Sequence, residues 1–353
     1  MYLKKFALLI CLLTTIASGA EKARNVILFL ADGTGIPTIN AASIHGYGKP
    51  RALYIQNMPH IGLSETSSAS SWVTDSAAGM TAIVTGKKTG NGILSQGPEA
   101  KRGVKDGAPL KTILEYAEEH GLATGVVSNS PMADATPAAC YAHVNDRSKF
   151  GEIFAQVLQP RFGDGVDVIM GPGRAAIMKG TAALGIDLAK ALPAKGYLFL
   201  DTPQALSSIN RGTRRVVALW DSEEFDLAGV VDAAIRILSQ NPKGFFLMVE
   251  SNNHMTNVKQ ALERTVRMDN MIRAVTQKWK RNSLILFTAD HSYDLRLPKG
   301  NIGEDILPLI RVDDHHTAEE VLIAAEGPGS DRVRGILPNT QLFHIMMAAY
   351  GWK

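Results

Sequence analysis

The chain has 353 residues, which is long for one ordinary domain but within the range of a single large α/β domain. Hydrophobic residues make up 45% and charged residues 20%, a balance normal for a globular protein that buries a sizeable core. The net charge of +3 and the pI of about 8.7 are too mild to indicate a nucleic-acid partner.

The first 20 residues are predicted to form a signal peptide. Lys4 and Lys5 precede an apolar run at residues 6–16, and small residues follow at 17–20. An uncleaved anchor is the alternative, which the run disfavours because it is shorter than the ~20 residues of a membrane span. We expect a periplasmic or secreted mature chain of residues 21–353, without stable membrane insertion. It would keep Cys140 as its single cysteine and have no internal disulfide.

Six short apolar runs are predicted to be buried parallel strands. They lie at residues 26–31, 124–127, 166–170, 216–220, 245–249 and 284–288. Helical patterns between and after them cover residues 110–120, 260–278 and 340–350, and the polar residues 64–71 are predicted to be a loop. Strands that alternate with helices predict an α/β fold with a mostly parallel sheet. No domain boundary is visible, so residues 21–353 are expected to form one domain.

Three of the predicted strands end in acidic residues. Asp32 follows residues 26–31, Glu250 follows 245–249, and Asp290 with His291 follows 284–288. In an open α/β sheet, ligands bind beyond the carboxyl ends of the strands. Crowded carboxylates repel one another unless cations neutralise them. Any one of these acids could be a helix cap or turn residue, but four such residues together favour a metal site of oxygen and nitrogen ligands.

Ser76 lies in the run T-D-S-A-A at residues 74–78, and the small residues after it suit a helix that begins there. A serine at a helix N-terminus lies beside free backbone N–H groups and the positive end of the dipole, which favours phosphate binding. From the local sequence alone, a plain N-cap role for Asp75 or Ser76 is the favoured interpretation.

Several motifs in order resemble the alkaline phosphatase family from about residue 25 to the C-terminus. They are D-G-T-G at 32–35, T-D-S-A-A at 74–78, T-G-K-K-T-G-N-G at 85–92, D-A-T-P-A-A at 134–139 with Arg147 beyond it, V-D-V-I-M-G-P-G-R at 166–174, T-A-D-H-S at 288–292 and H-T at 316–317. The resemblance implies a three-layer α/β sandwich with a large, mostly parallel sheet. It also implies a metal-dependent phosphate monoesterase with two zinc ions and one magnesium ion, and it is compatible with a homodimer.

The resemblance also implies a role for each matching residue. Ser76 would be the nucleophile and Arg147 would bind the phosphate oxygens in a bidentate fork. The implied ligands of the serine-side zinc are Asp32, Ser76, Asp290 and His291. Those of the magnesium are Asp32, Thr136 and Glu250, with Asp134 acting through water. Those of the other zinc are His254 and His316.

The segment from Glu250 to His254 departs from the family pattern. It is short and lacks the Asp that usually lies between the Glu and the His as a ligand of the second zinc. Asn252, Asn253 and the more distant Asp294 are the candidate substitutes, and His254 could also be an ordinary loop histidine. A neutral ligand would hold that zinc more weakly.

Two alternative functions remain open from the sequence. A phosphodiesterase of the same superfamily is disfavoured by Arg147, because a diester has one charged oxygen fewer. A non-catalytic protein that binds metal or phosphate is suggested only by the missing Asp. A sulfatase is disfavoured because Ser76 does not lie in a Cys- or Ser-x-Pro-x-Arg motif.

Overall fold

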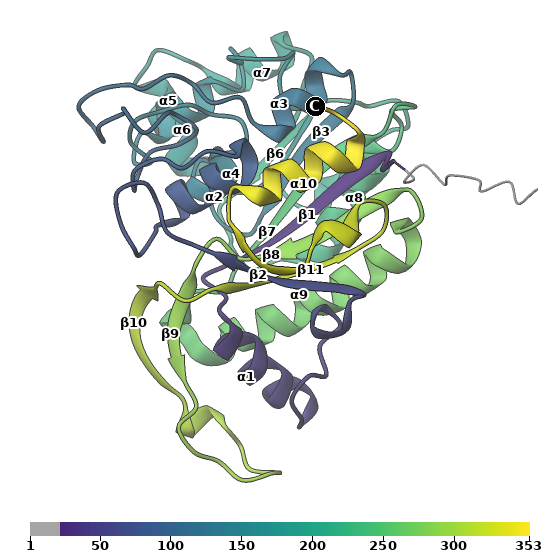
Figure 1. The fold of residues 1–353 in the computed structure, drawn as a ribbon. Helices are drawn as coiled ribbons and strands as arrows, with labels where there is room; N and C mark the ends of the chain where they lie inside the picture. Colours follow the sequence, from purple (N-terminus) through teal and green to yellow (C-terminus); the bar gives the residue numbers. More distant parts are fainter. Residues whose placement is uncertain (1–21) are drawn as a thin grey trace, which may run out of the picture.

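The computed structural model describes residues 22–353, and its centre is a ten-stranded sheet with helices on both faces (Figure 1). The strands lie in the order β12-β2-β11-β8-β1-β7-β3-β4-β6-β5. Neighbouring strands are parallel except around β11, which runs antiparallel to β2 and β8. The bounds are β1 (Asn25–Asp32), β2 (His60–Glu65), β3 (Ala123–Ser128), β4 (Val168–Pro172), β5 (Leu198–Leu200), β6 (Val216–Trp220), β7 (Phe245–Asn252), β8 (Ser283–Thr288), β11 (Val321–Glu326) and β12 (Gly335–Pro338).

Side chains alternate between the two faces along β1, so each face has its own apolar core. Leu28 and Leu30 pack into one core, and Ile27 and Phe29 pack into the other. The first core is covered by α2 (Ser76–Thr85), α3 (Ile113–Glu119), α4 (Ala135–Ala138), α5 (Phe150–Ala155), α6 (Arg174–Ala182), α7 (Leu188–Ala194) and α10 (Gln341–Tyr350). The second is covered by α1 (Ile36–Tyr47), α8 (Leu227–Leu238) and α9 (Val258–Trp279). The predicted three-layer α/β sandwich is therefore confirmed.

A separate two-stranded antiparallel sheet is formed by β9 (Ser292–Arg296) and β10 (Arg311–Thr317), and it projects away from the sandwich beside α1 (Figure 1). Short 3-10 helices complete the fold at Ile55–Asn57, Gln204–Ser208, Met255–Asn257, Leu307–Leu309 and Ser330–Arg332. Because β9 begins two residues after Asp290, this small sheet starts at the carboxyl edge of β8.

The register of the three central strands sets the height of the acidic residues. Leu30 of β1 lies level with Glu250 of β7 on one side and with Thr288 of β8 on the other. Asp32 lies two residues beyond Leu30, and Asp290 lies two residues beyond Thr288, so these two acids reach the same height. Glu250 lies two residues below them. The three carboxylates belong to the same edge of the sheet, as the strand-end pattern predicts.

All six predicted strands are present; the bounds of β6 match the prediction, and those of the other five shift by at most three residues. The strands β2, β5, β11 and β12 of the sheet were not predicted. β2 and β12 are largely exposed or half-buried and β5 has three residues, so none of these is a continuous buried run. β11 begins with a short apolar run at residues 321–325 that was not assigned to a strand. The predicted loop at 64–71 begins inside β2, which ends at Glu65. The helix expected over 110–120 begins later, at Ile113, where Thr112 forms a capping box.

The predicted signal peptide at residues 1–20 lies outside the described residues. Within residues 22–353, no helix combines the length and apolarity that crossing a bilayer requires. Cys140 is buried and forms no disulfide among the described residues.

Candidate active site

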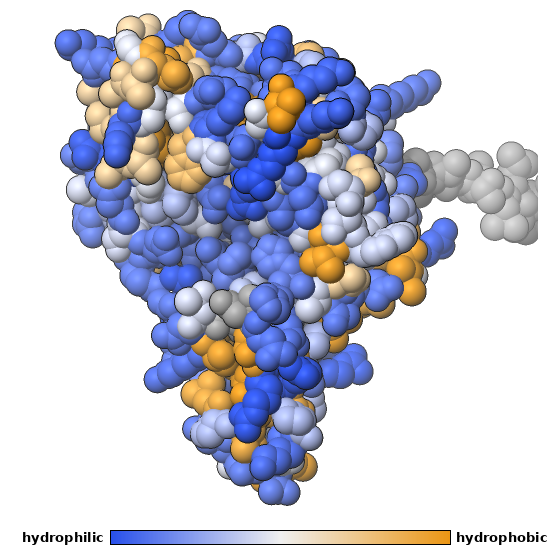
Figure 2. Space-filling view, turned by 90° about the vertical axis from the view of Figure 1, so that its left-hand side faces the viewer, coloured by the Kyte–Doolittle hydropathy of each residue, from blue (hydrophilic) through white to orange (hydrophobic). Residues whose placement is uncertain are grey.

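Figure 2 looks onto the face of the molecule that carries the strand ends, where hydrophilic residues cover the middle. Asp32, Glu250, Asp290 and His291 lie at or next to the carboxyl ends of β1, β7 and β8, and all four are buried. Buried carboxylates in such numbers are uncommon unless they are paired or bind cations. The predicted acidic rim is therefore a real cluster.

The innermost contacts join Asp32, Asp290, His291 and Ser76. His291 Nε2 lies 3.3 Å from Asp32 Oδ1, 3.5 Å from Asp290 Oδ2 and 3.3 Å from the Ser76 hydroxyl. Asp290 Oδ1 accepts from the backbone N–H groups of Gly33 and His291, which fixes its carboxylate. One oxygen of each acid, one imidazole nitrogen and one hydroxyl thus converge on a single point.

Ser76 is the first residue of α2, and the helix is built to bring it into this cluster. Asp75 is the N-cap and accepts from the N–H of Ala78 at 3.1 Å. Gly79, one turn into the helix, lies against Asp290, where a Cβ would be only 2.9 Å from the backbone oxygen. The small residue lets the positive end of the helix dipole approach the acids.

Three histidines form a second cluster on the outer side of the first. His254, His291 and His316 offer nitrogens within 4.8 Å of one another, and the rings of His291 and His316 stack at 3.6 Å. His291 Nδ1 lies 3.0 Å from the Ser292 carbonyl, and His316 Nδ1 lies 3.1 Å from the Thr74 carbonyl. A carbonyl can only accept, so Nδ1 carries a proton in both rings and Nε2 is the nitrogen that a metal can bind.

The charges of these groups are strongly coupled. The Asp32 carboxylate raises the pKa of His254 to about 9, and the two groups are 2.9 Å apart. Burial alone would raise the pKa of Asp32, but His254 and His291 hold it well below its ordinary value. Burial raises the pKa of Asp290 to about 6, and the Asp32 charge adds to the rise. The site therefore favours positive charge next to Asp32.

His316 differs from the other two histidines. Its pKa is lowered to about 4, mainly by burial and in part by the nearby charge of His291. Its imidazole is therefore neutral at physiological pH and ready to act as a ligand.

Among residues 22–353, two buried carboxylate oxygens have no hydrogen-bond partner, Glu250 Oε1 and Asp290 Oδ2. The other Glu250 oxygen accepts a short hydrogen bond from Ser128. Burial and then the Asp32 charge raise the pKa of Glu250 well above its ordinary value. An unpaired buried carboxylate oxygen is costly unless a cation satisfies it. The donor set of carboxylates and imidazoles therefore fits divalent metal ions.

Arg147 lies between the caps of two helices. Its Nη1 is 3.2 Å from Asp75, the N-cap of α2, and its Nη2 is 3.0 Å from Asp134, the N-cap of α4. Burial alone would lower the pKa of Arg147, but these two carboxylates raise it, so the guanidinium stays charged. Thr136 is buried in α4, two residues beyond Asp134.

The candidates for the missing carboxylate ligand all have hydrogen-bond or ion-pair partners. The Asn253 amide accepts from one hydroxyl at 2.9 Å and donates to another at 3.1 Å. Asp294 forms an ion pair of 3.2 Å with Arg296. Asn252 Oδ1 accepts from the backbone N–H of His254 at 3.1 Å. Asp294 joins neither cluster of acids and histidines found among residues 22–353, whereas the Asn252 and Asn253 amide oxygens each keep a second lone pair that could bind a metal.

The α/β fold and this site together define a metal-dependent hydrolase with a serine at a helix N-terminus. The family model described as alkaline phosphatase matches residues 23–303. The chain belongs to the alkaline phosphatase family, and it is a phosphatase that hydrolyses phosphate monoesters.

Relatives of known function and structure agree with this assignment. The chain is 29% identical to the alkaline phosphatase of Escherichia coli, over 94% of this chain and 87% of that protein. The structure of alkaline phosphatase from the Antarctic bacterium TAB5 superposes with a TM-score of 0.79 at 25% identity, covering 95% of this chain and 99% of the other. The Thermus thermophilus alkaline phosphatase shares the fold at a TM-score of 0.81 and 22% identity, covering 98% and 96%.

Direct contacts join six of the predicted residues, namely Asp32, Ser76, His254, Asp290, His291 and His316. Sequence reasoning missed several hydrogen-bond partners in the site: Asp75 beside Arg147, Ser128 beside Glu250, and Asn129 beside the Asn252 N–H. A usable signal existed for the last two, because they end the predicted strand 124–127 as Asp32 ends 26–31.

Proposed function

We propose that the chain hydrolyses phosphate monoesters through a covalent phosphoserine on Ser76, in a centre of two zinc ions and one magnesium ion. The observation that carries the proposal is the position of Ser76 Oγ at the N-terminus of α2, 3.3 Å from His291 Nε2. Family membership accounts for the phosphate monoester substrate, and the serine accounts for the nucleophile.

The ligands divide into three sets. The serine-side zinc would be held by Asp32, Ser76, Asp290 and His291; the magnesium by Asp32, Thr136 and Glu250, with Asp134 acting through water; and the other zinc by His254 and His316. When bound, these cations lower the pKa of the serine hydroxyl and neutralise the charge that develops on the phosphoryl oxygens. A third protein ligand for the second zinc would come from Asn252, Asn253 or Asp294, each of which now has a hydrogen-bond or ion-pair partner.

The reaction then uses the side chains as the structure arranges them. Ser76 Oγ attacks phosphorus, the bond from phosphorus to the ester oxygen breaks, and the alcohol leaves. Water then attacks the phosphoserine, which releases phosphate and restores the serine. The Arg147 guanidinium and the positive end of the α2 dipole stabilise the charged phosphoryl oxygens. Arg147 favours a monoester because a diester offers one charged oxygen fewer.

We also propose that residues 1–20 direct export and are removed. Residues 21–353 would then act as a single catalytic domain in the periplasm or outside the cell. N-terminal sequencing of the exported protein tests this, and cleavage after Ala20 is expected. Light scattering on the same sample tests assembly as a homodimer.

Rates on an aryl phosphate and on the matching aryl diester at alkaline pH test the substrate class. The monoester should be hydrolysed much faster by the wild-type protein, and Ser76→Ala should lose most of that rate. A faster diester rate would make the chain a phosphodiesterase instead. Phosphate binding without turnover in the metal-loaded protein would make it a non-catalytic binding protein.

A further inference from the structure

The short segment between Glu250 and His254 is bonded at Asn252 to two side chains from outside its own strand. The Asn252 N–H donates to Asn129 Oδ1 at 2.6 Å, and the Asn252 carbonyl accepts from Arg264 Nη1 at 3.1 Å. Its side-chain oxygen accepts from the backbone N–H of His254. Because both backbone polar groups of Asn252 are bonded to side chains from other elements, this point of the segment is fixed.

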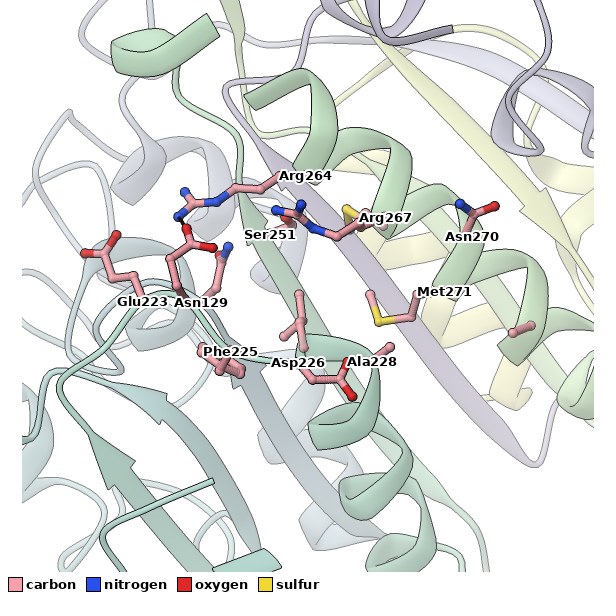
Figure 3. A pocket seen from close by; sticks show the side chains of 14 residues that line it. Asn129, Glu223, Phe225, Asp226, Ala228, Ser251, Arg264, Arg267, Asn270 and Met271 are labelled. Carbon is pink, nitrogen blue, oxygen red and sulfur yellow. Dashed lines mark hydrogen bonds and ion pairs between the residues drawn. The ribbon is translucent and has the colours of Figure 1, made fainter. Parts of the chain in front are cut away.

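Arg264 is itself held in place. It projects from α9 with a side chain that is only 11% exposed, and its Nη2 lies 2.5 Å from Glu224. The same Glu224 oxygen accepts from Gln260 at 2.6 Å. Figure 3 shows Arg264 extending from α9 over a cavity of about 400 Å³, toward the side where Asn129 lies. The two guanidinium nitrogens thus connect α9, the loop before α8 and the Asn252 carbonyl.

The geometry points to a role for Arg264 and Asn129 as a clamp that positions His254 for zinc, a role that rests on the function proposed above. His254 follows Asn252 by two residues, so the clamp sets where its imidazole can lie. On the inner side, Gly33 limits the ring, because a Cβ there would be 2.7 Å from His254 Cδ2. The imidazole is therefore confined from two directions.

This clamp matters because the second zinc has few ligands in the chain. The segment lacks a carboxylate between Glu250 and His254, so each remaining ligand must be well oriented to bind the ion. Hydrogen bonds behind a metal ligand typically change affinity by about 10–100-fold. Arginine suits the task because its planar fork donates to Glu224 and to the carbonyl together, which a lysine ammonium reproduces poorly.

The test measures zinc binding directly in Arg264→Met and Arg264→Lys. Arg267→Met is the matched control, since Arg267 lies one turn further along α9, lines the same cavity and makes only a 3.9 Å ion pair with Glu263. Zinc affinity is measured by chelator competition, and the cobalt-substituted protein gives an absorption spectrum that reports ligand geometry. Thermal unfolding of the metal-free proteins separates metal binding from stability.

Arg264→Met should weaken the more weakly held zinc by about tenfold or more and change the cobalt spectrum. Arg264→Lys should recover only part of the affinity, and Arg267→Met should match the wild type. Should Arg264→Met fail to fold, Asn129→Ala removes the opposite arm of the clamp and should weaken zinc in the same way.

Wild-type zinc affinity and an unchanged cobalt spectrum in the folded Arg264 or Asn129 variants would overturn the clamp while leaving the proposed function intact. A wild-type protein that binds no zinc would overturn both. Lower thermal stability with normal zinc binding would assign Arg264 a purely structural role and would also overturn the clamp.

Discussion

Glu118 provides a quantitative test of the burial described for this structure, away from the active site. It lies in α3 and is 6% exposed. Its oxygens accept from the N–H of Gly165 at 3.0 Å and from the Thr124 hydroxyl at 3.2 Å. Burial is the main cause that raises the pKa of Glu118 from 4.5 to about 8, despite these two donors. Glu118→Gln removes the titration but keeps an amide that can bond to both neighbours.

The raised pKa has a definite consequence for stability. A rise from 4.5 to about 8, at 1.36 kcal/mol per pH unit, corresponds to about 5 kcal/mol. The folded protein binds the Glu118 proton more tightly than the unfolded chain does, so this stability is present below pH 4.5. It is lost as the pH rises toward 8, and about 4 kcal/mol of the loss falls between pH 5 and pH 9.

Urea unfolding of wild type and Glu118→Gln at pH 5 and pH 9 measures this difference. The free energy of unfolding of the wild type should fall by about 4 kcal/mol more than that of Glu118→Gln. The control is Glu119→Gln at the next position. The Glu119 side chain is 40% exposed and pairs with Lys111 at the surface, so this variant should show the same pH dependence as the wild type. Equal pH dependence in wild type and Glu118→Gln would refute the reasoning from burial.

Three further predictions concern the active site. Arg147→Lys should lower kcat/KM on an aryl phosphate by about 100-fold, because lysine cannot form the fork between Asp75, Asp134 and the substrate; a loss below threefold would contradict this. Gly79→Ala should reduce kcat although alanine favours helices, because its Cβ would meet the Asp290 backbone oxygen at 2.9 Å; wild-type kinetics would show that α2 can shift freely. Chelation should abolish activity, and zinc with magnesium should restore it, as followed by rate and metal content; full activity in metal-free protein would contradict a metal-dependent site.

The central part of the fold could be predicted because its strands are buried on both faces. The run at residues 245–249 has no polar residue, and three of these strands lead into acidic side chains of the site. The clustering of Asp32, Glu250 and Asp290 follows from parallel strands alone. The peripheral strands gave no such signal: β2 alternates between buried and partly exposed residues, and β5 has three residues.

The parts of the site that could not be predicted depend on contacts between distant segments. Arg147 was expected to face the phosphate, but its pairing with Asp75, 72 positions earlier, depends on how α2 and α4 pack. The clamp on Asn252 depends on a hydrogen bond to Asn129, just after β3, and another from Arg264 of α9, which no local pattern indicates. Helix and strand periodicity describes which face a residue lies on, and it does not define its partner.

The most direct test of the central claim is a search for phosphate on Ser76. The wild-type protein is mixed with a phosphate monoester, quenched in acid within the first turnovers, digested and analysed by mass spectrometry. The account predicts a phosphorylated peptide that contains Ser76, formed within the first turnover and absent in Ser76→Ala. Rapid monoester hydrolysis with an unmodified Ser76, or full activity in Ser76→Ala, would contradict it.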